Sequence, residues 1–277
     1  MNQHSPGCRP AKSVLITGAS GGIGQALVAR FGAAGWRVIP TDRRDSELIM
    51  DVTDEASVQT ARARVGVPDV VINNAGLGLF GPLAELPDDS LVRQFEVNVR
   101  GLARVTRAFV PDMCRRGSGR VINVGSLAGV FTPPFFGGYA ATKHAVEAMS
   151  DALRLEVAPF GVQVCLIEPS VVGTAFVEAS LASLGRAAVG SSWREPMLET
   201  VARRDAFRPV EMTAEQVAAV IFHAATARRP RARYRVGALA SWLIRALGML
   251  PTPLRDALLR AAGGLRKLPA PHPANAP

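Results

Sequence analysis

Short apolar runs alternate with amphipathic segments along most of the chain. Apolar, β-branched runs predict strands at Ser13–Thr17, Arg37–Thr41, Glu47–Met50, Asp69–Asn73, Arg120–Gly125, Val162–Glu168 and Arg233–Val236. Helical spacing of apolar residues predicts helices at Ile23–Ala34, Asp54–Val65, Asp88–Arg115, Tyr139–Phe160 and Thr213–Ala227. Strands that alternate with helices in this way are typical of a doubly wound α/β fold, in which helices cover both faces of a parallel sheet.

The same pattern divides the chain into one domain and its extensions. We expect a disordered N-terminus over residues 1–12, a single domain over 13–236, a basic amphipathic helical appendage over 237–265 and a disordered tail over 266–277. Two short helices, Leu239–Gly248 and Pro253–Ala262, are predicted in the appendage. Residues 175–210 are too many for a bare connection, so we expect one or two short helices there that close over a substrate.

Composition narrows the class of protein. With 277 residues, 48% of them hydrophobic and 20% charged, the chain is predicted to be globular rather than disordered. The three cysteines and four histidines lack the spacing of a disulfide framework or a metal site, so no metal is expected. The longest apolar stretch, 238–250, is interrupted by Arg245 and is shorter than the ~20 residues of a membrane-spanning helix. These patterns predict a soluble, cytoplasmic protein.

The formal net charge of +9 is not spread evenly along the sequence. Residues 1–200 hold 19 basic and 19 acidic side chains, whereas residues 201–277 hold 13 basic and 4 acidic ones. A basic amphipathic helix that carries Trp242 can lie on an anionic membrane surface. We favour the alternative, in which the appendage packs on the domain or on a partner subunit with its charges solvated. Nucleic-acid binding is not expected, because no helix-turn-helix or aromatic-interleaved basic stripe is visible.

A glycine-rich turn follows the first predicted strand. Residues 17–24 are TGASGGIG, and glycines at such a turn let the backbone approach a pyrophosphate at a helix N-terminus. Asp42 ends the second strand, where a carboxylate suits the ribose 2′-hydroxyl of NAD. Arg43 and Arg44 would suit the 2′-phosphate of NADP. The sequence therefore predicts a Rossmann-like dinucleotide site that favours NAD and leaves NADP open.

Three further residues have the chemistry of a proton-transfer site. Tyr139 and Lys143 share one face of a predicted helix, and a lysine ammonium beside the phenol is expected to lower the pKa of the tyrosine. The tyrosine could then act as an acid or base near neutral pH. Ser126 ends the fifth strand, where its hydroxyl can hold a substrate oxygen.

Taken together, these motifs resemble those of the short-chain dehydrogenase/reductase family, and especially its steroid and retinol dehydrogenase members. The matching motifs are TGASGGIG at 17–24, Asp51-Val52, NNAG at 73–76, Asn98, Ser126, YAATK at 139–143, and Glu168-Pro169 followed by Thr174. The resemblance covers roughly residues 12–236. It implies a catalytic tetrad in which Asn98 holds a water, Ser126 orients the substrate oxygen, Tyr139 transfers the proton and Lys143 binds the nicotinamide ribose.

The resemblance also implies which residues contact the cofactor. They are Gly18, Ser20, Gly22, Ile23, Gly24, Asp42, Arg43, Asp51, Val52, Asn74, Ala75, Gly76, Tyr139, Lys143, Pro169, Val172 and Thr174. One departure is Ser170, which stands where the family usually has glycine, so the turn there is expected to differ slightly. Family members are commonly dimers or tetramers, and a homodimer or homotetramer is expected.

The expected substrate is a small hydrophobic alcohol or ketone. Phe131, Phe135, Phe136 and Phe176 fall in segments that should border the crevice at the strand ends, and an apolar crevice favours an apolar ligand. These residues could instead be ordinary core. Two other functions stay open, a reductase of 3-oxoacyl thioesters and a non-catalytic dinucleotide sensor.

Overall fold

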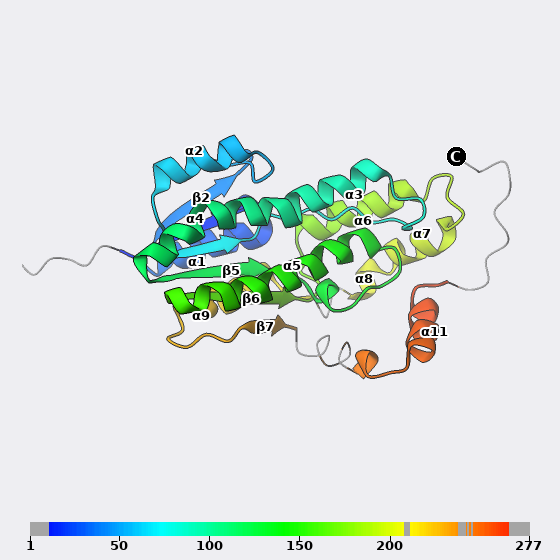
Figure 1. Cartoon of the computed structure of the whole chain (residues 1–277). Coiled ribbons are helices and arrows are strands. Elements are labelled where there is room, and N and C mark those ends of the chain that lie inside the picture. Colours follow the sequence, from blue (N-terminus) through cyan, green and yellow to red (C-terminus); the bar gives the residue numbers. More distant parts are fainter. Residues whose placement is uncertain (1–10, 208–210, 238–241, 243, 245, 266–277) are drawn as a thin grey trace, which may run out of the picture.

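A seven-stranded parallel sheet forms the centre of the protein (Figure 1). In this computed structural model, residues 11–207, 211–237, 242, 244 and 246–265 are described. The strands are β1 (Ser13–Thr17), β2 (Arg37–Asp42), β3 (Leu48–Ile49), β4 (Val70–Asn73), β5 (Gly119–Val124), β6 (Val162–Pro169) and β7 (Arg233–Val236). Their order, β3-β2-β1-β4-β5-β6-β7, reverses direction between β1 and β4, which confirms the doubly wound α/β prediction.

Helices cover both faces of this sheet. Their bounds are α1 (Gly22–Ala33), α2 (Glu55–Val65), α3 (Asp88–Phe95), α4 (Leu102–Arg116), α5 (Gly137–Val157), α6 (Ala175–Ala187), α7 (Arg194–Ala202), α8 (Arg204–Phe207), α9 (Ala214–Thr226) and α11 (Thr252–Ala262), with 3₁₀ turns at Leu127–Gly129 and Ala158–Phe160. Helices α1 and α9 pack on one face, and α2, α4 and α5 pack on the other. The sheet is therefore buried on both sides.

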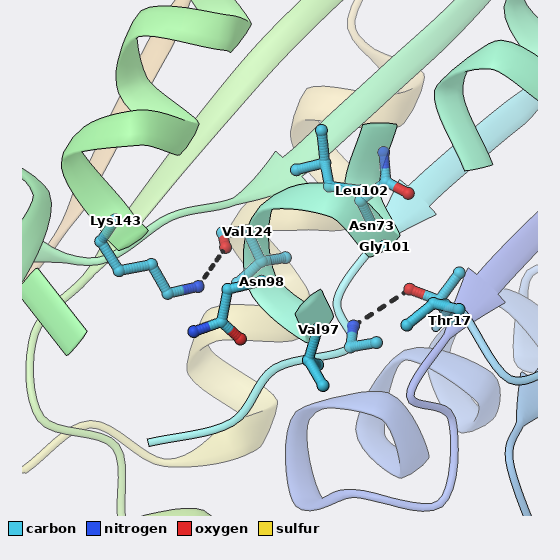
Figure 2. Close-up of a pocket in the computed structure, with 10 residues that line it drawn as sticks. Thr17, Asn73, Val97, Asn98, Gly101, Leu102, Val124 and Lys143 are labelled. Carbon is cyan, nitrogen blue, oxygen red and sulfur yellow. Dashed lines mark hydrogen bonds between the residues drawn. The ribbon is translucent and has the colours of Figure 1, made fainter. Parts of the chain in front are cut away.

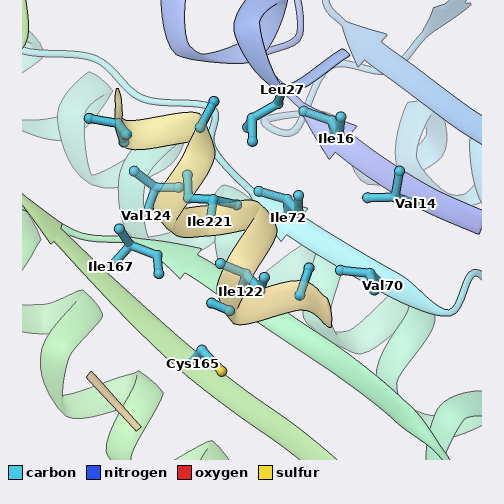
Figure 3. Close-up of a cluster of buried hydrophobic side chains, with 14 of the residues drawn as sticks. Val14, Ile16, Leu27, Val70, Ile72, Ile122, Val124, Cys165, Ile167 and Ile221 are labelled. Carbon is cyan, nitrogen blue, oxygen red and sulfur yellow. The ribbon is translucent and has the colours of Figure 1, made fainter. Parts of the chain in front are cut away.

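Branched apolar side chains explain why the strands sit at the centre. Ile16, Ile72 and Ile122 come from neighbouring strands and meet Leu27 of α1 and Ile221 of α9 (Figure 3). All five side chains are fully buried. Burial of such side chains is the main stabilising contribution to a fold of this kind.

The long helix predicted over Asp88–Arg115 is present but is not uniformly α-helical. Between α3 and α4, residues Glu96–Gly101 form a π-helical segment with one extra residue in its turn. Apolar periodicity cannot reveal such a segment, because the insertion shifts the phase by less than a third of a turn. The segment contains Asn98, which matters for the site described below.

The segment after Thr174 is more helical than expected. It forms three helices, α6, α7 and α8, where one or two were predicted. The helix predicted at Pro253–Ala262 is confirmed as α11, which lies apart from the sheet (Figure 1). The other predicted helix of the appendage, Leu239–Gly248, falls partly outside the described residues, as do the disordered ends predicted at 1–12 and 266–277.

Part of the C-terminal charge is not solvated. Arg233 and Arg235 belong to β7, and their guanidinium groups pair with Glu147, Asp151 and Glu168. Arg204 pairs with Glu178 and Glu211 in the same way. The excess of basic residues in the last quarter of the sequence does not reveal these pairs, because only the fold brings the acidic side chains to the three arginines.

Removing a central core side chain should destabilise the whole domain. We expect Ile122→Ala to lower the free energy of unfolding by about 2–5 kcal/mol, since the side chain is fully buried in β5 and leaves a cavity. Leu155→Ala is the control, because Leu155 is 66% exposed and should change stability by less than about 0.5 kcal/mol. Urea unfolding followed by circular dichroism measures both, and equal losses would contradict this assignment of the core.

Candidate active site

The predicted site residues meet at the carboxyl ends of the strands. The glycine turn follows β1, Asn74 and its neighbours follow β4, Ser126 follows β5, and Thr174 follows β6. The reversal of strand order between β1 and β4 opens the edge of the sheet at this point, where doubly wound folds bind ligands. The helix α5 brings Tyr139 and Lys143 to the same edge.

The glycine turn leaves space where other residues would fill it. Gly18 has a φ of +66°, and a Cβ on Gly24 would stand 2.2 Å from the carbonyl oxygen of Gly18. A Cβ on Gly22 would stand 2.7 Å from the Cγ2 atom of Thr174. At the start of α1, the N-cap residue Gly21 makes no side-chain hydrogen bond, so the first backbone N–H groups of the helix face outward without a side-chain cap. This open cradle fits a dinucleotide pyrophosphate.

The carboxylate of Asp42 is held at the rim of this cradle. It accepts hydrogen bonds from the backbone N–H of Ser20 at 3.1 Å, from the Ser20 hydroxyl at 2.5 Å and from the N–H of Arg43 at 2.7 Å. The side chains of Arg43 and Arg44 are exposed. A fixed negative charge at this position suits a ribose hydroxyl and repels a phosphate.

The residues after β3 and β4 complete the cofactor side of the site. Asp51 accepts hydrogen bonds from the N–H and hydroxyl of Thr53, at 2.8 and 2.7 Å, which fixes the turn that carries Val52. The N–H groups of Asn74 and Ala75 both donate to Thr17 Oγ1 at 3.0 Å. The Asn74 amide also donates to the carbonyl of Gly18, so the loop after β4 is tied to the glycine turn.

The side chain of Asn98 makes three hydrogen bonds inside the protein. Its amide oxygen accepts from the N–H of Leu77 at 2.7 Å, and its amide nitrogen donates to the carbonyl of Leu77 and to the Thr142 hydroxyl. The resemblance implied that Asn98 holds a water. In the structure these hydrogen bonds fasten the loop after β4 to α5, and the role in holding a water stays a prediction.

A small cavity lies beside Asn98 and Lys143 (Figure 2). Its volume of about 10 Å³ is close to what one water molecule needs. Asn73 also lines it, and the buried Asn73 Oδ1 has no hydrogen-bond partner in the described part of the chain. A polar, water-sized cavity next to the lysine is consistent with a bound water there.

Tyr139 and Lys143 occupy successive turns on the buried face of α5. The Lys143 ammonium donates to the carbonyl of Val124 at 2.9 Å and lies 5.7 Å from the centre of the Tyr139 ring. Both side chains are less than a tenth exposed. Burial lowers the pKa of Lys143 to about 8, and the nearby Glu147 carboxylate acts in the opposite direction.

The pKa of Tyr139 differs from the expectation. Burial raises it to about 12, and a side-chain hydrogen bond with Ser126 only partly opposes this. The prediction of a lowered tyrosine pKa is therefore wrong for this structure, because burial of the phenol is the largest effect on it, and the Lys143 ammonium donates to Val124. The contact between Ser126 and Tyr139, which the sequence placed thirteen residues apart, does form.

Aromatic side chains cover the tyrosine. The ring of Tyr139 lies 5.7 Å from that of Phe80 and 5.9 Å from that of Phe176, and Phe80 in turn lies 4.0 Å from Phe136. Phe135 is buried in the same cluster with a φ of +70°. Of the four phenylalanines predicted to border the substrate, Phe135, Phe136 and Phe176 come together around Tyr139, whereas Phe131 is not among the side chains of this cluster.

The turn after β6 carries the last predicted cofactor residues. Pro169 ends the strand, Val172 pairs with Met212, and Thr174 caps the start of α6 against Gly22. The backbone N–H of Ser170 donates to the carbonyl of Val236 at 2.9 Å. Ser170 is not among the described residues with positive φ, so the turn accommodates serine without strain.

Sequence reasoning missed Glu147 as a residue of this region. It follows Lys143 by one helical turn and is 8% exposed, and it was overlooked because glutamate on a helix is normally solvated. The signal that could have found it is spacing, since Tyr139, Lys143 and Glu147 are each four residues apart. In the described residues, no group of three histidines, cysteines or acidic side chains could hold a metal ion.

Known proteins share both the sequence and the fold. The family model described as "short chain dehydrogenase" matches residues 12–184. Human 17-beta-hydroxysteroid dehydrogenase type 1 is 39% identical over 251 residues, which cover 80% of this chain and 76% of that protein. The NADPH-dependent 3-dehydrocapnine reductase of Ornithobacterium rhinotracheale is 30% identical, with 87% of this chain and 94% of that protein covered.

A solved structure supports the same assignment. The structure of a short-chain dehydrogenase/reductase of Burkholderia phymatum in complex with NAD is 26% identical in sequence and has a TM-score of 0.73. The match covers 85% of this chain and 92% of that protein. The matched family model covers more than half of the chain, and it includes the glycine turn, Ser126, Tyr139 and Lys143. The chain therefore belongs to the short-chain dehydrogenase/reductase family and is an NAD(P)-dependent oxidoreductase.

Proposed function

We propose that the protein interconverts a hydrophobic secondary alcohol and its ketone, and that the substrate is lipid-like, of the steroid or retinoid kind. The observation that carries this proposal is the aromatic cluster around Tyr139, which consists of Phe80, Phe135, Phe136 and Phe176. A reacting carbon next to Tyr139 must lie against these rings, and such surroundings favour an apolar ligand. Similarity to a human hydroxysteroid dehydrogenase supports the same class.

The bound nicotinamide supplies or accepts the hydride, and the protein moves the proton. Ser126 and Tyr139 are joined by a hydrogen bond, so both hydroxyls can meet one substrate oxygen. Because its pKa is raised to about 12, Tyr139 keeps its proton at neutral pH and can donate it to the oxygen of a ketone as that carbon is reduced. In the reverse direction the phenolate form of Tyr139, which the forward step leaves, would accept the proton of the alcohol as that carbon is oxidised.

Lys143 would hold the cofactor beside this pair. Its ammonium is less than a tenth exposed and is bonded to Val124, so it is fixed at the end of β5 with further N–H groups available to a ribose. On the other side, Gly18, Gly22 and Gly24 would admit the pyrophosphate, and Asp42 would bind the adenosine ribose. We propose NAD as the preferred cofactor, since the Asp42 carboxylate repels a 2′-phosphate.

We also propose that α11 contacts an anionic membrane surface, although the sequence patterns favoured packing on the domain or on a partner subunit. Leu254 and Leu258 lie one turn apart on α11 and are 50% and 46% exposed, and no residue of this helix is buried. Arg255 and Arg260 belong to the same helix, in the part of the chain that holds the whole charge excess. Exposed leucines beside arginines match the interface of a bilayer with anionic lipids. Among the described residues, no helix is long and apolar enough to cross a membrane.

This surface also adjoins the aromatic cluster. A Cβ on Gly263, just after α11, would stand 3.1 Å from Pro134, and Leu265 packs against the cluster around Tyr139. Arg203 of the segment that follows α7 donates to the carbonyl of Ala262. An apolar substrate taken from a bilayer would therefore enter beside its binding site.

Removal of the phenolic hydroxyl tests the enzyme against the non-catalytic alternative. We expect Tyr139→Phe to lower turnover by roughly 10²–10⁴-fold, because the proton donor is lost. Binding of NAD, measured by calorimetry, should remain. The control is Tyr234→Phe, which alters the second tyrosine of the chain, in β7, and should keep its turnover. Unchanged turnover in Tyr139→Phe would refute the proposed mechanism.

Cofactor preference is tested at the rim of the glycine cradle. We expect Asp42→Ala to raise the ratio of kcat/KM for NADP to that for NAD by about tenfold, or ~1.4 kcal/mol, because a ribose acceptor and a charge that repels phosphate are both lost. Asp45→Ala, an exposed carboxylate three residues away, should leave the ratio unchanged. A wild-type preference for NADP would contradict the role given to Asp42.

Membrane contact is tested with vesicles and with a variant that introduces two negative charges in place of exposed leucines. The double variant Leu254→Asp, Leu258→Asp should lose the co-sedimentation with phosphatidylglycerol vesicles that we expect of the wild type. Neither the wild type nor the double variant should bind phosphatidylcholine vesicles strongly. Ile49→Asp is the control, since Ile49 is 54% exposed near the opposite edge of the sheet. Equal sedimentation of all three proteins would argue against this surface, and a change in oligomeric state of the double variant would assign it to a subunit contact instead.

A further inference from the structure

A cluster of five charged side chains lies between α5, β6 and β7. It consists of Glu147 and Asp151 of α5, Glu168 of β6, and Arg233 and Arg235 of β7, and is called the β7 ion cluster below. Arg233 approaches all three carboxylates, at 2.9 Å from Glu147, 2.7 Å from Asp151 and 3.3 Å from Glu168. Arg235 stands 2.6 Å from the other oxygen of Glu168. The proposed mechanism uses none of these groups.

Two of the three carboxylates, Glu147 and Glu168, are buried, whereas Asp151, Arg233 and Arg235 are partly exposed. The three carboxylates face Arg233 and Arg235, and Arg154 also pairs with Asp151 at 2.9 Å, so three guanidinium groups match the three carboxylates. Glu168 is fully buried and Glu147 is 8% exposed, and one buried oxygen of each, Oε1, has no hydrogen-bond partner in the described part of the chain. Burial raises the pKa of Glu147 to about 7, and the charge of Glu168 acts in the same direction.

Glu147 connects this cluster to the active site in two ways. It lies one turn beyond Lys143 on the same helix face, and its charge favours the ammonium form of the lysine. It also supports the turn after β5. A Cβ on Gly129 would stand 3.0 Å from Glu147 Cγ, and one on Gly125 would stand 3.6 Å from Glu147 Oε1. Ser126 lies between these two glycines.

We propose that Glu147 is a positioning residue for the reaction, which supports the turn that carries Ser126 and maintains the ammonium charge of Lys143. The proposal rests on the roles given above to Ser126 and Lys143. Asp151 does not share this position, because its side chain is 42% exposed and its contacts are with Arg154 and Arg233.

The direction of the pH effect follows from the groups that surround Glu147. Lys143 and Asp151 face it from α5, Glu168 from β6, and Arg233 and Arg235 from β7. Above about pH 7 the carboxylate is charged and raises the pKa of Lys143, and the value of about 8 already combines this effect with the larger lowering by burial. Loss of that negative charge should lower the pKa of Lys143 further. Activity that requires the ammonium would then decline at a lower pH.

The test compares two variants that each remove one carboxylate from Arg233. In Glu147→Gln, we expect the alkaline limb of kcat/KM against pH to move to lower pH by about one unit, the size expected for a nearby opposite charge. In Asp151→Asn, the same change of charge should leave the limb within a few tenths of a unit of the wild type. Thermal unfolding verifies that both variants are folded.

The outcomes separate this proposal from the proposed function. The role of Glu147 would be refuted if the alkaline limb of kcat/KM in folded Glu147→Gln stayed at its wild-type pH, or if it moved equally in both variants. Either result would leave the mechanism at Tyr139 intact. Turnover that survives Tyr139→Phe would instead refute the mechanism. If Glu147→Gln does not fold, Glu147→Asp is the substitute variant. Its shorter side chain withdraws the carboxylate, so the alkaline limb should move in the same direction but by a smaller amount. An unshifted limb in this variant would overturn the proposal.

Discussion

Apolar packing on both faces of one parallel sheet determines where this protein can perform chemistry. Side chains from β1, β4, β5 and β6 are covered by α1 and α9 on one face and by α2, α4 and α5 on the other. Polar groups along the strands would be buried without partners, so they collect where the strands end. The reversal of strand order between β1 and β4 then opens that edge, and the glycine turn, Ser126 and Thr174 all follow strand ends there.

Helix α5 is the exception, because its buried face is polar. Tyr139, Lys143 and Glu147 follow one another at four-residue spacing, and all are less than a tenth exposed. Each is held by a specific neighbour: Tyr139 by Ser126, Lys143 by Val124 and Glu147 by Arg233. Burial changes the pKa of all three in the direction that disfavours charge. The packing of α5 against β5 and β6 therefore also sets the protonation states at the site.

The positive charge of the chain is divided between two environments. Arg204, Arg233 and Arg235 are held by carboxylates of the folded domain, and Arg233 joins α5 to the edge strand β7. The arginines of α11 stand beside exposed leucines instead. A net charge counted from the sequence does not distinguish these cases, although the first concerns the active site and the second a surface.

The sequence by itself determined the strands, most helices, the glycine turn and the pairing of Tyr139 with Lys143. Those features depend on periodicity and short motifs, which are local properties of the chain. The π-helical segment at Asn98, the number of helices between Thr174 and the α9 helix, and the direction of the Tyr139 pKa were decided only by the tertiary structure. So was the pairing of Glu147 with Arg233, which are 86 residues apart. Burial and the neighbours of a charge arise when distant segments pack together, and they decide how much a charged form is favoured.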